Sequence, residues 1–260
     1  MEKLNKAREI IIEKIKATMD TAVLGLSGGA DSLLVTLLCI DALGKDQVYT
    51  FGMPYGKTDR DGFNQLSYRI SRVLGVKYKD IRIDKIVDEI CDGIIWAMGG
   101  EVGQINHGNA RARSRMSILY SISHKLESES MQRVRVVGTG NLSEDYIGYD
   151  TKGGDALADI FPIGDLFKSE VYKMLDSYKD ADKIGEWMIN RTPSAGLWEG
   201  QTDEGELGLG YNPMEPAIKN LLAGKKPETD IEKKVLDLHL KNKHKHEAPP
   251  VVSLRDFLDE

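Results

Sequence analysis

The sequence predicts an α/β protein whose single parallel sheet is doubly wound, with helices on both faces. Two observations support this prediction. Short apolar segments typical of buried strands alternate along the chain with longer segments that repeat apolar residues at helical spacing. Glycine-rich turns follow the first and the fourth of these strands, where ligands of parallel sheets bind. The 260 residues suffice for one large domain, so we expect residues 1–260 to form a single domain.

The first half of the chain begins with an amphipathic helix and continues with strands and helices in alternation. Residues 2–19 place apolar side chains at helical spacing with charges between them, which predicts that first helix. Residues 22–26 form a continuous apolar run, the pattern of a buried strand, and residues 31–43 continue as a helix. The further elements of this half are strands at 46–54 and 76–84 and helices at 60–74 and 84–98.

The second half contains the fourth strand and the remaining helices. Residues 108–126 predict a helix that is basic at its start and apolar later, and residues 133–141 predict a strand that ends in a Gly turn. A loop leads into a helix within residues 161–175, and a Gly- and Pro-rich segment follows at 193–213. For that segment we hypothesise a lid over a reaction intermediate. Two further helical patterns lie at 214–223 and 230–243.

Composition and charge narrow the class of protein. The net charge is −6, which disfavours a nucleic-acid partner. The two cysteines, Cys39 and Cys91, form neither a metal-like pair nor a disulfide framework. No apolar run reaches the length of a membrane span, and the charged N-terminus lacks the core of a signal peptide. We therefore expect a protein of the reducing cytoplasm with no membrane partner.

The turn after the first strand carries the strongest chemical signal. Residues 27–32 read Ser-Gly-Gly-Ala-Asp-Ser between two apolar runs. Backbone N–H groups at a helix N-terminus bind anions, and glycines let a phosphate approach the backbone closely. The alternative is a tight capped turn that binds nothing. Neither the P-loop pattern nor the three spaced glycines of a dinucleotide fingerprint is present.

Several separated motifs together suggest a family. Ser-Gly-Gly-x-Asp-Ser directly after a strand resembles the pyrophosphate loop of the N-type ATP pyrophosphatases. "GNARARSRM", residues 138–171, "TPSAGLWEGQTDEGELGLGY" and "KHKHEAPP" make the chain similar to the ammonia-dependent NAD synthetases over nearly its whole length. The resemblance implies an adenine nucleotide α-hydrolase-like sheet, a homodimer, and no glutaminase domain of the kind that glutamine-using relatives carry.

The resemblance also implies the residues that bind ATP and magnesium. Asp31 and Glu144 match metal ligands, and two carboxylates at different strand ends suit a hard cation on a triphosphate. Taken alone, Glu144 would be an ordinary first-turn acid that the helix dipole favours. The ATP-binding residues implied are Gly25, Leu26, Ser27, Gly28, Gly29, Ala30, Asp31, Ser32, Thr139, Lys168 and Ser194.

A second set of residues matches the family's binding site for deamido-NAD. Arginine and lysine suit its pyrophosphate and its nicotinate carboxylate. The implied residues are Arg113, Lys152, Asp159, His244 and Lys245. For the last two, a metal-binding histidine tract with His239 and His246, or a plain basic tail, are the alternatives. The chain departs from the family at Gly153, where an aromatic residue is usual, and in its "HKHE" ending. Gly196 and Gly205 also stand where acids are common in the family.

The implied reaction proceeds in two chemical steps and is the last reaction of NAD biosynthesis. The nicotinate carboxylate of deamido-NAD attacks the α-phosphate of ATP, which gives an acyl-adenylate and pyrophosphate. Ammonia then attacks the activated carbonyl and gives NAD and AMP. ATP is a co-substrate and magnesium the cofactor. No side-chain nucleophile is needed, and Cys39 and Cys91 lie in apolar helices, where thiols are more often buried than reactive.

Three alternatives come from other classes of protein. The same loop occurs in guanylate-making and tRNA-modifying enzymes, but the acidic balance of this chain counts against an RNA substrate. A nucleotide sensor without chemistry would have lost its metal ligands, whereas Asp31 and Glu144 are both present. A plain α/β scaffold would leave the residues of the loop unexplained.

Overall fold

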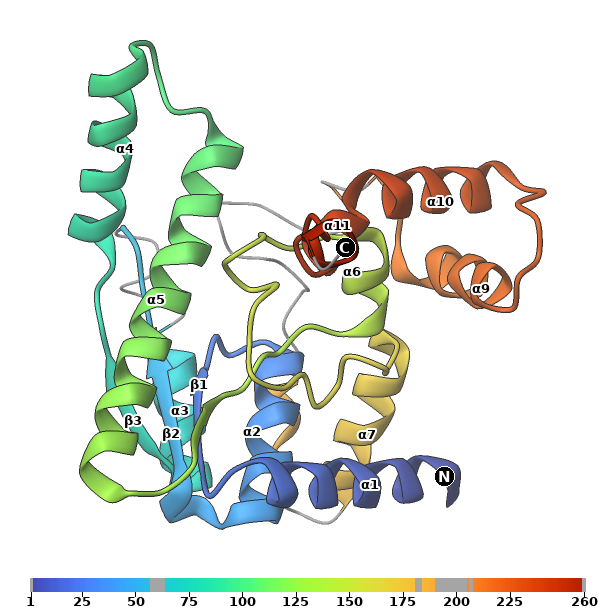
Figure 1. Ribbon diagram of the computed structural model, residues 1–260. Coiled ribbons are helices and arrows are strands. Elements are labelled where there is room, and N and C mark those ends of the chain that lie inside the picture. Colours follow the sequence, from blue (N-terminus) through green and yellow to red (C-terminus); the bar gives the residue numbers. More distant parts are fainter. Residues whose placement is uncertain (1, 57–63, 181–183, 190–204, 206–207, 259–260) are drawn as a thin grey trace.

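The fold is built on a parallel four-stranded sheet with the strand order β3-β2-β1-β4 (Figure 1). The computed structural model describes residues 2–56, 64–180, 184–189, 205 and 208–258. Helices lie on both faces of the sheet, which confirms the predicted doubly wound α/β fold. The strands are β1 (Thr21–Gly25), β2 (Val48–Gly52), β3 (Lys77–Asp80) and β4 (Val134–Val136).

The order in which the strands join the sheet determines where a ligand can bind. The chain first adds β2 and β3 on one side of β1, and then returns to place β4 on the other side. Val23 in β1 therefore pairs with Tyr49 on one side and with Val136 on the other. The turns after β1 and β4 lie next to each other at this reversal, which is the usual ligand site of open parallel sheets.

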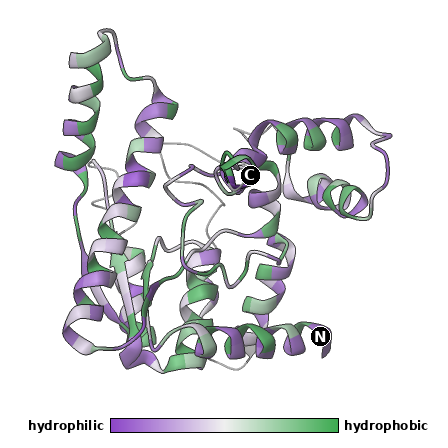
Figure 2. Ribbon diagram, viewed as in Figure 1, coloured by the Kyte–Doolittle hydropathy of each residue, from purple (hydrophilic) through white to green (hydrophobic). Residues whose placement is uncertain are grey.

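Two groups of helices cover the two faces. Leu24, Leu34, Ile70 and Val171 belong to one buried cluster, and Val23, Met116 and Val136 belong to another. Figure 2 shows apolar residues concentrated along the sheet and on the helix sides that face it. The first group comprises α1 (Glu2–Thr18), α2 (Ala30–Leu43), α3 (Asn64–Leu74) and α7 (Lys168–Asp180), and the second comprises α4 (Asp84–Met98) and α5 (Gln104–Ser130).

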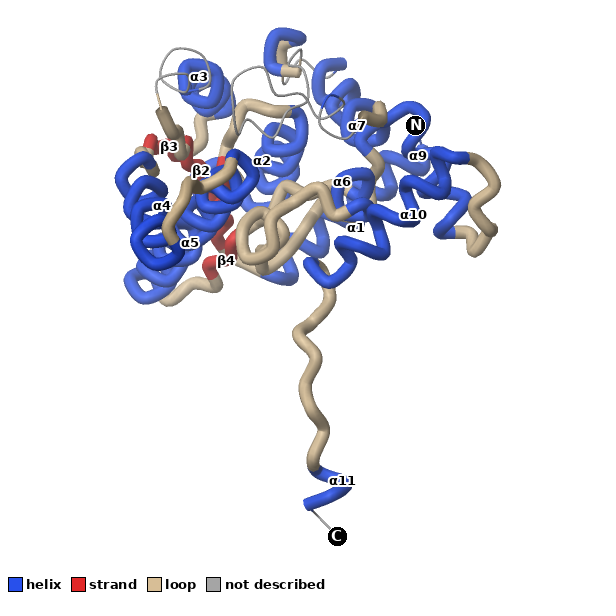
Figure 3. The backbone as a smooth tube through the Cα atoms, turned by 90° about the horizontal axis from the view of Figure 1, so that it is seen from above, coloured by secondary structure: helices blue, strands red, loops and turns tan. Residues whose placement is uncertain are grey.

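The C-terminal part adds a helical hairpin with a small core of its own. Ile147, Phe167, Met214, Ile218 and Val235 are buried together there. The hairpin is formed by α9 (Tyr211–Leu222) and α10 (Asp230–Asn242), and it packs on α6 (Leu142–Ile147). Short 3-10 turns are η1 (Lys45–Gln47), η3 (Glu186–Met188) and η4 (Lys243–Lys245). An extended segment then leads away from the body to α11 (Arg255–Leu258) (Figure 3).

The predicted elements are present, with corrected boundaries. The helix predicted at 84–98 has those bounds, whereas that predicted at 108–126 is the longer α5. The strands predicted at 46–54 and 76–84 are shorter, because pairing between β2 and β3 ends at Gly52 and Asp80. The six-residue helix α6 was not predicted, because it is too short to show a helical period. Among the described residues, no helix is both long and apolar enough to cross a membrane.

Candidate active site

The turn between β1 and α2 forms an open cradle rather than a capped turn. Ser27 Oγ and Ser32 Oγ lie 3.0 Å apart, and Gly29 N–H donates to Ser27 Oγ at 3.2 Å. Gly28 has a φ of 79°, which only glycine adopts readily. The N-cap of α2 is Gly29, and no side chain caps this helix. The first-turn N–H groups of α2 therefore remain available to an anion, which disfavours the capped-turn alternative.

Lys168 joins the two predicted metal ligands. Its Nζ lies 2.5 Å from Asp31 Oδ2 and 3.0 Å from Glu144 Oε1. The Lys168 side chain is 6% exposed and both carboxylates are 18% exposed. Asp31 lies in the first turn of α2, Glu144 in the first turn of α6, and Lys168 begins α7. Three elements thus bring three predicted residues to the reversal between β1 and β4.

The charges of Asp31, Glu144 and Lys168 do not cancel. Burial raises the pKa of Asp31 to about 6, with Lys168 opposing the rise and Glu144 adding to it. Burial disfavours the ammonium of Lys168, but attraction from Glu144 and Asp31 outweighs burial and raises its pKa above the usual value. One ammonium between two carboxylates leaves excess negative charge. Carboxylate oxygens are the ligands that magnesium prefers, so the donor set fits a divalent cation.

Asn141 is a site residue that the sequence did not reveal. Its side chain is fully buried, and its Oδ1 accepts the N–H groups of Ser143 and Glu144 at 3.1 and 3.2 Å. Its Nδ2 donates to Asp31 Oδ1 at 3.2 Å. One side chain therefore caps α6 and orients Asp31. The signal that could have found it is an asparagine followed by Glu144 three residues later, which is typical of a helix start.

The other predicted ATP residues surround the cradle or lie outside the described residues. Gly25 ends β1, Leu26 N–H donates to Phe51 O at 2.9 Å, and Ala30 begins α2. Thr139 lies in the neighbouring turn, which follows β4. Ser194 and most of the hypothesised lid at 193–213 lie outside the residues that the structure describes.

Four of the five predicted dinucleotide-binding residues lie close together. Arg113 Nε donates to Lys152 O at 3.1 Å, and Lys152 Nζ donates to His244 O at 2.6 Å. Lys245 Nζ donates to Gly148 O at 2.6 Å and to Asp150 O at 2.7 Å. Helix α5, the loop after α6 and the turn η4 therefore meet at one place.

Asp159 is not part of that group. Its Oδ2 accepts the N–H of Val136 at 2.7 Å, and its Oδ1 accepts the hydroxyl of Tyr120 at 3.4 Å. The next residue, Ile160, forms a parallel bridge with Val137. The described contacts of Asp159 thus bind it to the edge of β4.

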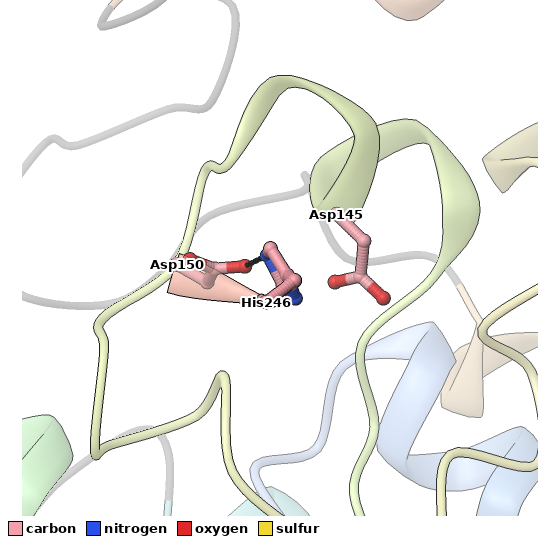
Figure 4. Close-up of side chains that lie close together, drawn as sticks. All are labelled: Asp145, Asp150 and His246. Atoms are coloured by element: carbon pink, nitrogen blue, oxygen red, sulfur yellow. Dashed lines mark ion pairs between the residues drawn. The ribbon is translucent and has the colours of Figure 1, made fainter. Parts of the chain in front are cut away.

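An ion pair fastens the C-terminal segment to the loop at 148–152. His246 Nε2 lies 2.5 Å from Asp150 Oδ2, and Asp145 points toward the pair (Figure 4). The contact with the Asp150 carboxylate raises the pKa of His246, and burial raises that of Asp145 to about 7. The three side chains have metal-ligating groups within 4.8 Å of one another. We call the contacts of residues 244–246 with 148–152 the tail latch.

His239 does not join the other histidines of the tail. Its Nδ1 lies 2.8 Å from Tyr146 O, and its ring stacks on that of Tyr146 with centroids 4.3 Å apart. The described contacts therefore give no support to a metal-binding tract of His239, His244 and His246.

Both thiols are buried, as expected for structural cysteines. Burial raises the pKa of the Cys39 thiol to about 12 and also raises the pKa of Cys91. Because the thiolate is the reactive form, neither group suits a nucleophile at neutral pH.

Comparison with known proteins shows which family the chain resembles. The family model described as NAD synthase matches residues 3–249. The NH3-dependent NAD+ synthetase of Methanocaldococcus jannaschii is 40% identical over 267 residues, covering 96% of this chain and 95% of the relative. The structure described as NMN synthetase from Francisella tularensis is similar with a TM-score of 0.78 and 26% identity, covering 96% and 98% of the two chains. The structure of the Campylobacter jejuni NH3-dependent NAD synthetase with a nitrate ion has a TM-score of 0.73 and 26% identity, covering 96% and 99%.

Proposed function

Because the chain belongs to the NAD synthase family, we propose that it amidates deamido-NAD with ammonia at the expense of ATP. It is a carbon–nitrogen ligase that makes NAD, AMP and pyrophosphate in the last step of NAD biosynthesis. The observation that carries the proposal is Lys168 between Asp31 and Glu144, beside the uncapped N-terminus of α2. That arrangement supports binding of a triphosphate and of the cation that accompanies it.

We call the turn between β1 and α2, together with Asp31, Glu144 and Lys168, the nucleotide side of the site. It acts mainly through its charges and through the positions of its hydrogen-bond donors. The N–H groups at the start of α2 bind phosphate oxygens, and Ser27 and Ser32 add hydroxyls to the cradle. Lys168 neutralises negative charge as pyrophosphate leaves. Magnesium, held by Asp31 and Glu144, would offset the charge of the triphosphate. Ser194 and Thr139 belong to the proposed ATP site on the family resemblance.

The dinucleotide side supplies cations to bind the second substrate. Arg113, Lys152, His244 and Lys245 lie together, and they suit a pyrophosphate and a carboxylate. Asp159 belongs to the proposed set on the family resemblance alone. A free carboxylate is a poor acylating agent, so adenylation provides the leaving group that ammonia then displaces. Residues that orient the two substrates can supply much of the rate enhancement.

We also propose a homodimer that forms through the face of α4. Ile86, Ile90 and Ile94 recur every four residues and are exposed, as are Trp96 and Met98 at the end of the helix. Monomers seldom expose an apolar patch of this kind, and a second copy of the chain is the occupant that the family resemblance implies. Sedimentation analysis should give a dimer, which Ile94→Glu converts to a monomer. A monomeric wild-type protein at micromolar concentration would contradict this assignment.

A cytoplasmic location and a single domain are parts of the same proposal. Both cysteines are free and buried, which suits a reducing compartment. The helices and strands from α1 to α7 pack on the two faces of one sheet, and the α9–α10 hairpin rests on α6. Limited proteolysis of a single domain should give no two stable halves.

The decisive assay measures pyrophosphate and NAD together. ATP, magnesium and deamido-NAD are supplied with ammonium or with glutamine, and NAD is expected from ammonium only. Asp31→Asn should abolish both products, whereas Asp176→Asn, an exposed acid on α7, should leave them unchanged. Folded protein that releases neither product would contradict the proposed reaction and favour a sensor.

A mononucleotide acid is the second candidate substrate. The neighbour described as NMN synthetase has a TM-score of 0.78, against 0.73 for the NAD synthetase neighbour. The same amidation on the nicotinate mononucleotide would give NMN. Parallel reactions with both acids decide between them by their ratio of kcat/KM.

A further inference from the structure

Helix α9 presents two polar side chains to the active site, one turn apart. Tyr211 is the first residue of α9 and Glu215 follows four residues later, so both lie on one face of the helix. Glu215 is only 5% exposed. Because a buried carboxylate is costly unless it is hydrogen-bonded, its partners show what it does. Neither residue was predicted from the sequence.

Glu215 ties together the starts of two helices that carry active-site residues. Its Oε1 accepts the N–H of Ser169 at 2.9 Å and the hydroxyl of Ser143 at 3.2 Å, and its Oε2 accepts the hydroxyl of Ser169 at 2.6 Å. The hydroxyl of Ser143 in turn accepts the N–H of Lys168 at 3.0 Å. Ser143 precedes Glu144 in α6, and Ser169 follows Lys168 in α7. A negative charge at the N-terminus of α7 is also favoured by the helix dipole.

Tyr211 acts on Glu144 itself. Its hydroxyl donates to Glu144 Oε1 at 2.9 Å, the same oxygen that accepts Lys168 Nζ at 3.0 Å. The Lys168 ammonium also lies 5.5 Å from the centre of the Tyr211 ring. Among the described residues, Glu144 Oε2 has no hydrogen-bond donor. Both donors therefore hold one oxygen of the carboxylate and leave the other for a cation.

We propose that Tyr211 and Glu215 are positioning residues, which set the geometry of Glu144 and Lys168 for binding the metal and ATP. Tyr211 fixes the orientation of the Glu144 carboxylate, and Glu215 fixes the backbone from which Glu144 and Lys168 extend. The C-terminal hairpin thereby takes part in the site that the β1 and β4 turns form. This inference rests on the proposed function, because it assigns Glu144 to the cation of that reaction.

The first test removes one hydroxyl. Tyr211→Phe keeps the ring beside Lys168 and removes the donor to Glu144. Manganese replaces magnesium as the probe, and the affinity of the full-length protein for Mn²⁺ with ATP is measured by electron paramagnetic resonance. Loss of a group that orients a metal ligand typically weakens affinity by about 10–100-fold, and we expect this range. Tyr49→Phe is the control, because its hydroxyl accepts a bond from Lys77 on β3 and, among the described residues, contacts no group of the site.

The second test neutralises the buried acid. Glu215→Gln places an amide opposite the N–H of Ser169, and we expect weaker Mn²⁺ binding, a raised KM for ATP and a lowered kcat. Glu232→Gln is the matched control, because Glu232 is also buried and accepts the N–H groups of Glu228 and Thr229 at the start of α10. Urea unfolding of both variants gives their stability. Only Glu215→Gln should change Mn²⁺ affinity.

The outcomes separate this inference from the proposed reaction. Unchanged Mn²⁺ affinity in both Tyr211→Phe and Glu215→Gln, while the wild type makes NAD, would overturn the positioning role and leave the reaction standing. An equal loss in Glu232→Gln would also overturn it, because general destabilisation would then explain the effect. Weaker Mn²⁺ binding in a protein whose wild type makes no NAD would support the positioning role and overturn the reaction.

Discussion

The nucleotide side of the site and the tail latch are held together in different ways. On the nucleotide side, charged side chains contact one another, and Lys168 lies between Asp31 and Glu144 with little exposure. In the latch, His246 and Lys245 pair with Asp150, and lysine side chains also donate to backbone carbonyls, as the exposed Lys152 does to His244. Water can replace exposed bonds of the second kind at small cost, whereas buried charges need their partners. The exposed bond of Lys152 should therefore be weaker than the buried contacts of Lys168.

Two departures from the family fall on the latch side. Gly153 replaces the usual aromatic residue, has a φ of 75°, and would place a Cβ in open space. His246 lies in the unusual "HKHE" ending and pairs with Asp150. On the nucleotide side Ser194 stands where threonine is usual, whereas Asp31, Glu144 and Lys168 match the family.

The largest expected effect is the removal of Lys168. Lys168→Met leaves Asp31 and Glu144 without their cation, which typically costs about 3–5 kcal/mol of unfolding free energy in a buried pair. Lys152→Met, at the exposed end of the latch, should cost less than about 1 kcal/mol. Urea unfolding of both variants measures the difference. Equal losses would contradict the division between a buried and an exposed region.

The Lys168→Met deficit should depend on pH. The pKa of Asp31 is already about 6 with the lysine present and should rise further without it. A carboxyl whose folded pKa is raised becomes less destabilising as the pH falls and the proton binds. The deficit should therefore be smaller at pH 5 than at pH 8, and a deficit that grows on acidification would contradict the charge imbalance.

The next effect concerns Asn141. Asn141→Ala removes the cap of α6, at about 0.5–2 kcal/mol, together with the donor to Asp31. Asn141→Asp keeps an oxygen for the cap but loses that donor and adds a negative charge. We expect the aspartate variant to be more stable than the alanine variant in urea, yet to lose pyrophosphate release. Equal activity of wild type and Asn141→Asp would show that Asp31 needs no such orientation.

Alanine substitutions at two glycines form a matched pair, and we expect each to lower stability less than the removal of Lys168. Gly28 and Gly153 have φ values of 79° and 75°, so an alanine at either costs about 1–2 kcal/mol in backbone strain. At Gly28 the new Cβ would also lie 3.1 Å from Leu66 Cδ2, whereas at Gly153 it meets no atom within 4 Å. Thermal unfolding should rank Gly28→Ala as the less stable variant. Only Gly28→Ala should raise the KM for ATP.

The smallest effect is the pH dependence of the latch. The pKa of His246 is raised from 6.5 by Asp150, so the pair stabilises the fold while His246 is protonated. Its contribution is complete below pH 6.5 and is lost as the pH rises through the raised pKa. Unfolding free energies of wild type and His246→Asn should differ at low pH and converge at high pH. His124→Asn, an exposed histidine of α5, is the control.

Local sequence patterns predicted much of the fold and the phosphate-binding turn of the site. The apolar runs and helical spacings predicted the strands and the long helices, and the Ser-Gly-Gly-x-Asp-Ser turn identified the cradle. The family resemblance added Lys168, Glu144 and the latch residues. Tyr211 and Glu215 were missed because tyrosine and glutamate near helix starts are common and carry no distinctive spacing. The spacing of Asn141 and Glu144 marks only a helix start, so it did not reveal the contact of Asn141 with Asp31.

What the sequence by itself determined was local: which segments form strands and helices, and where a turn can bind phosphate. Side-chain periodicity and glycine freedom act over a few residues, so they are readable along the chain. Only the tertiary structure decided that Lys168 meets Asp31, which lies 137 residues away, and that Asp159 binds β4 rather than the latch. Such contacts depend on the strand order, which places β4 beside β1, and on burial, which forces distant charges to pair.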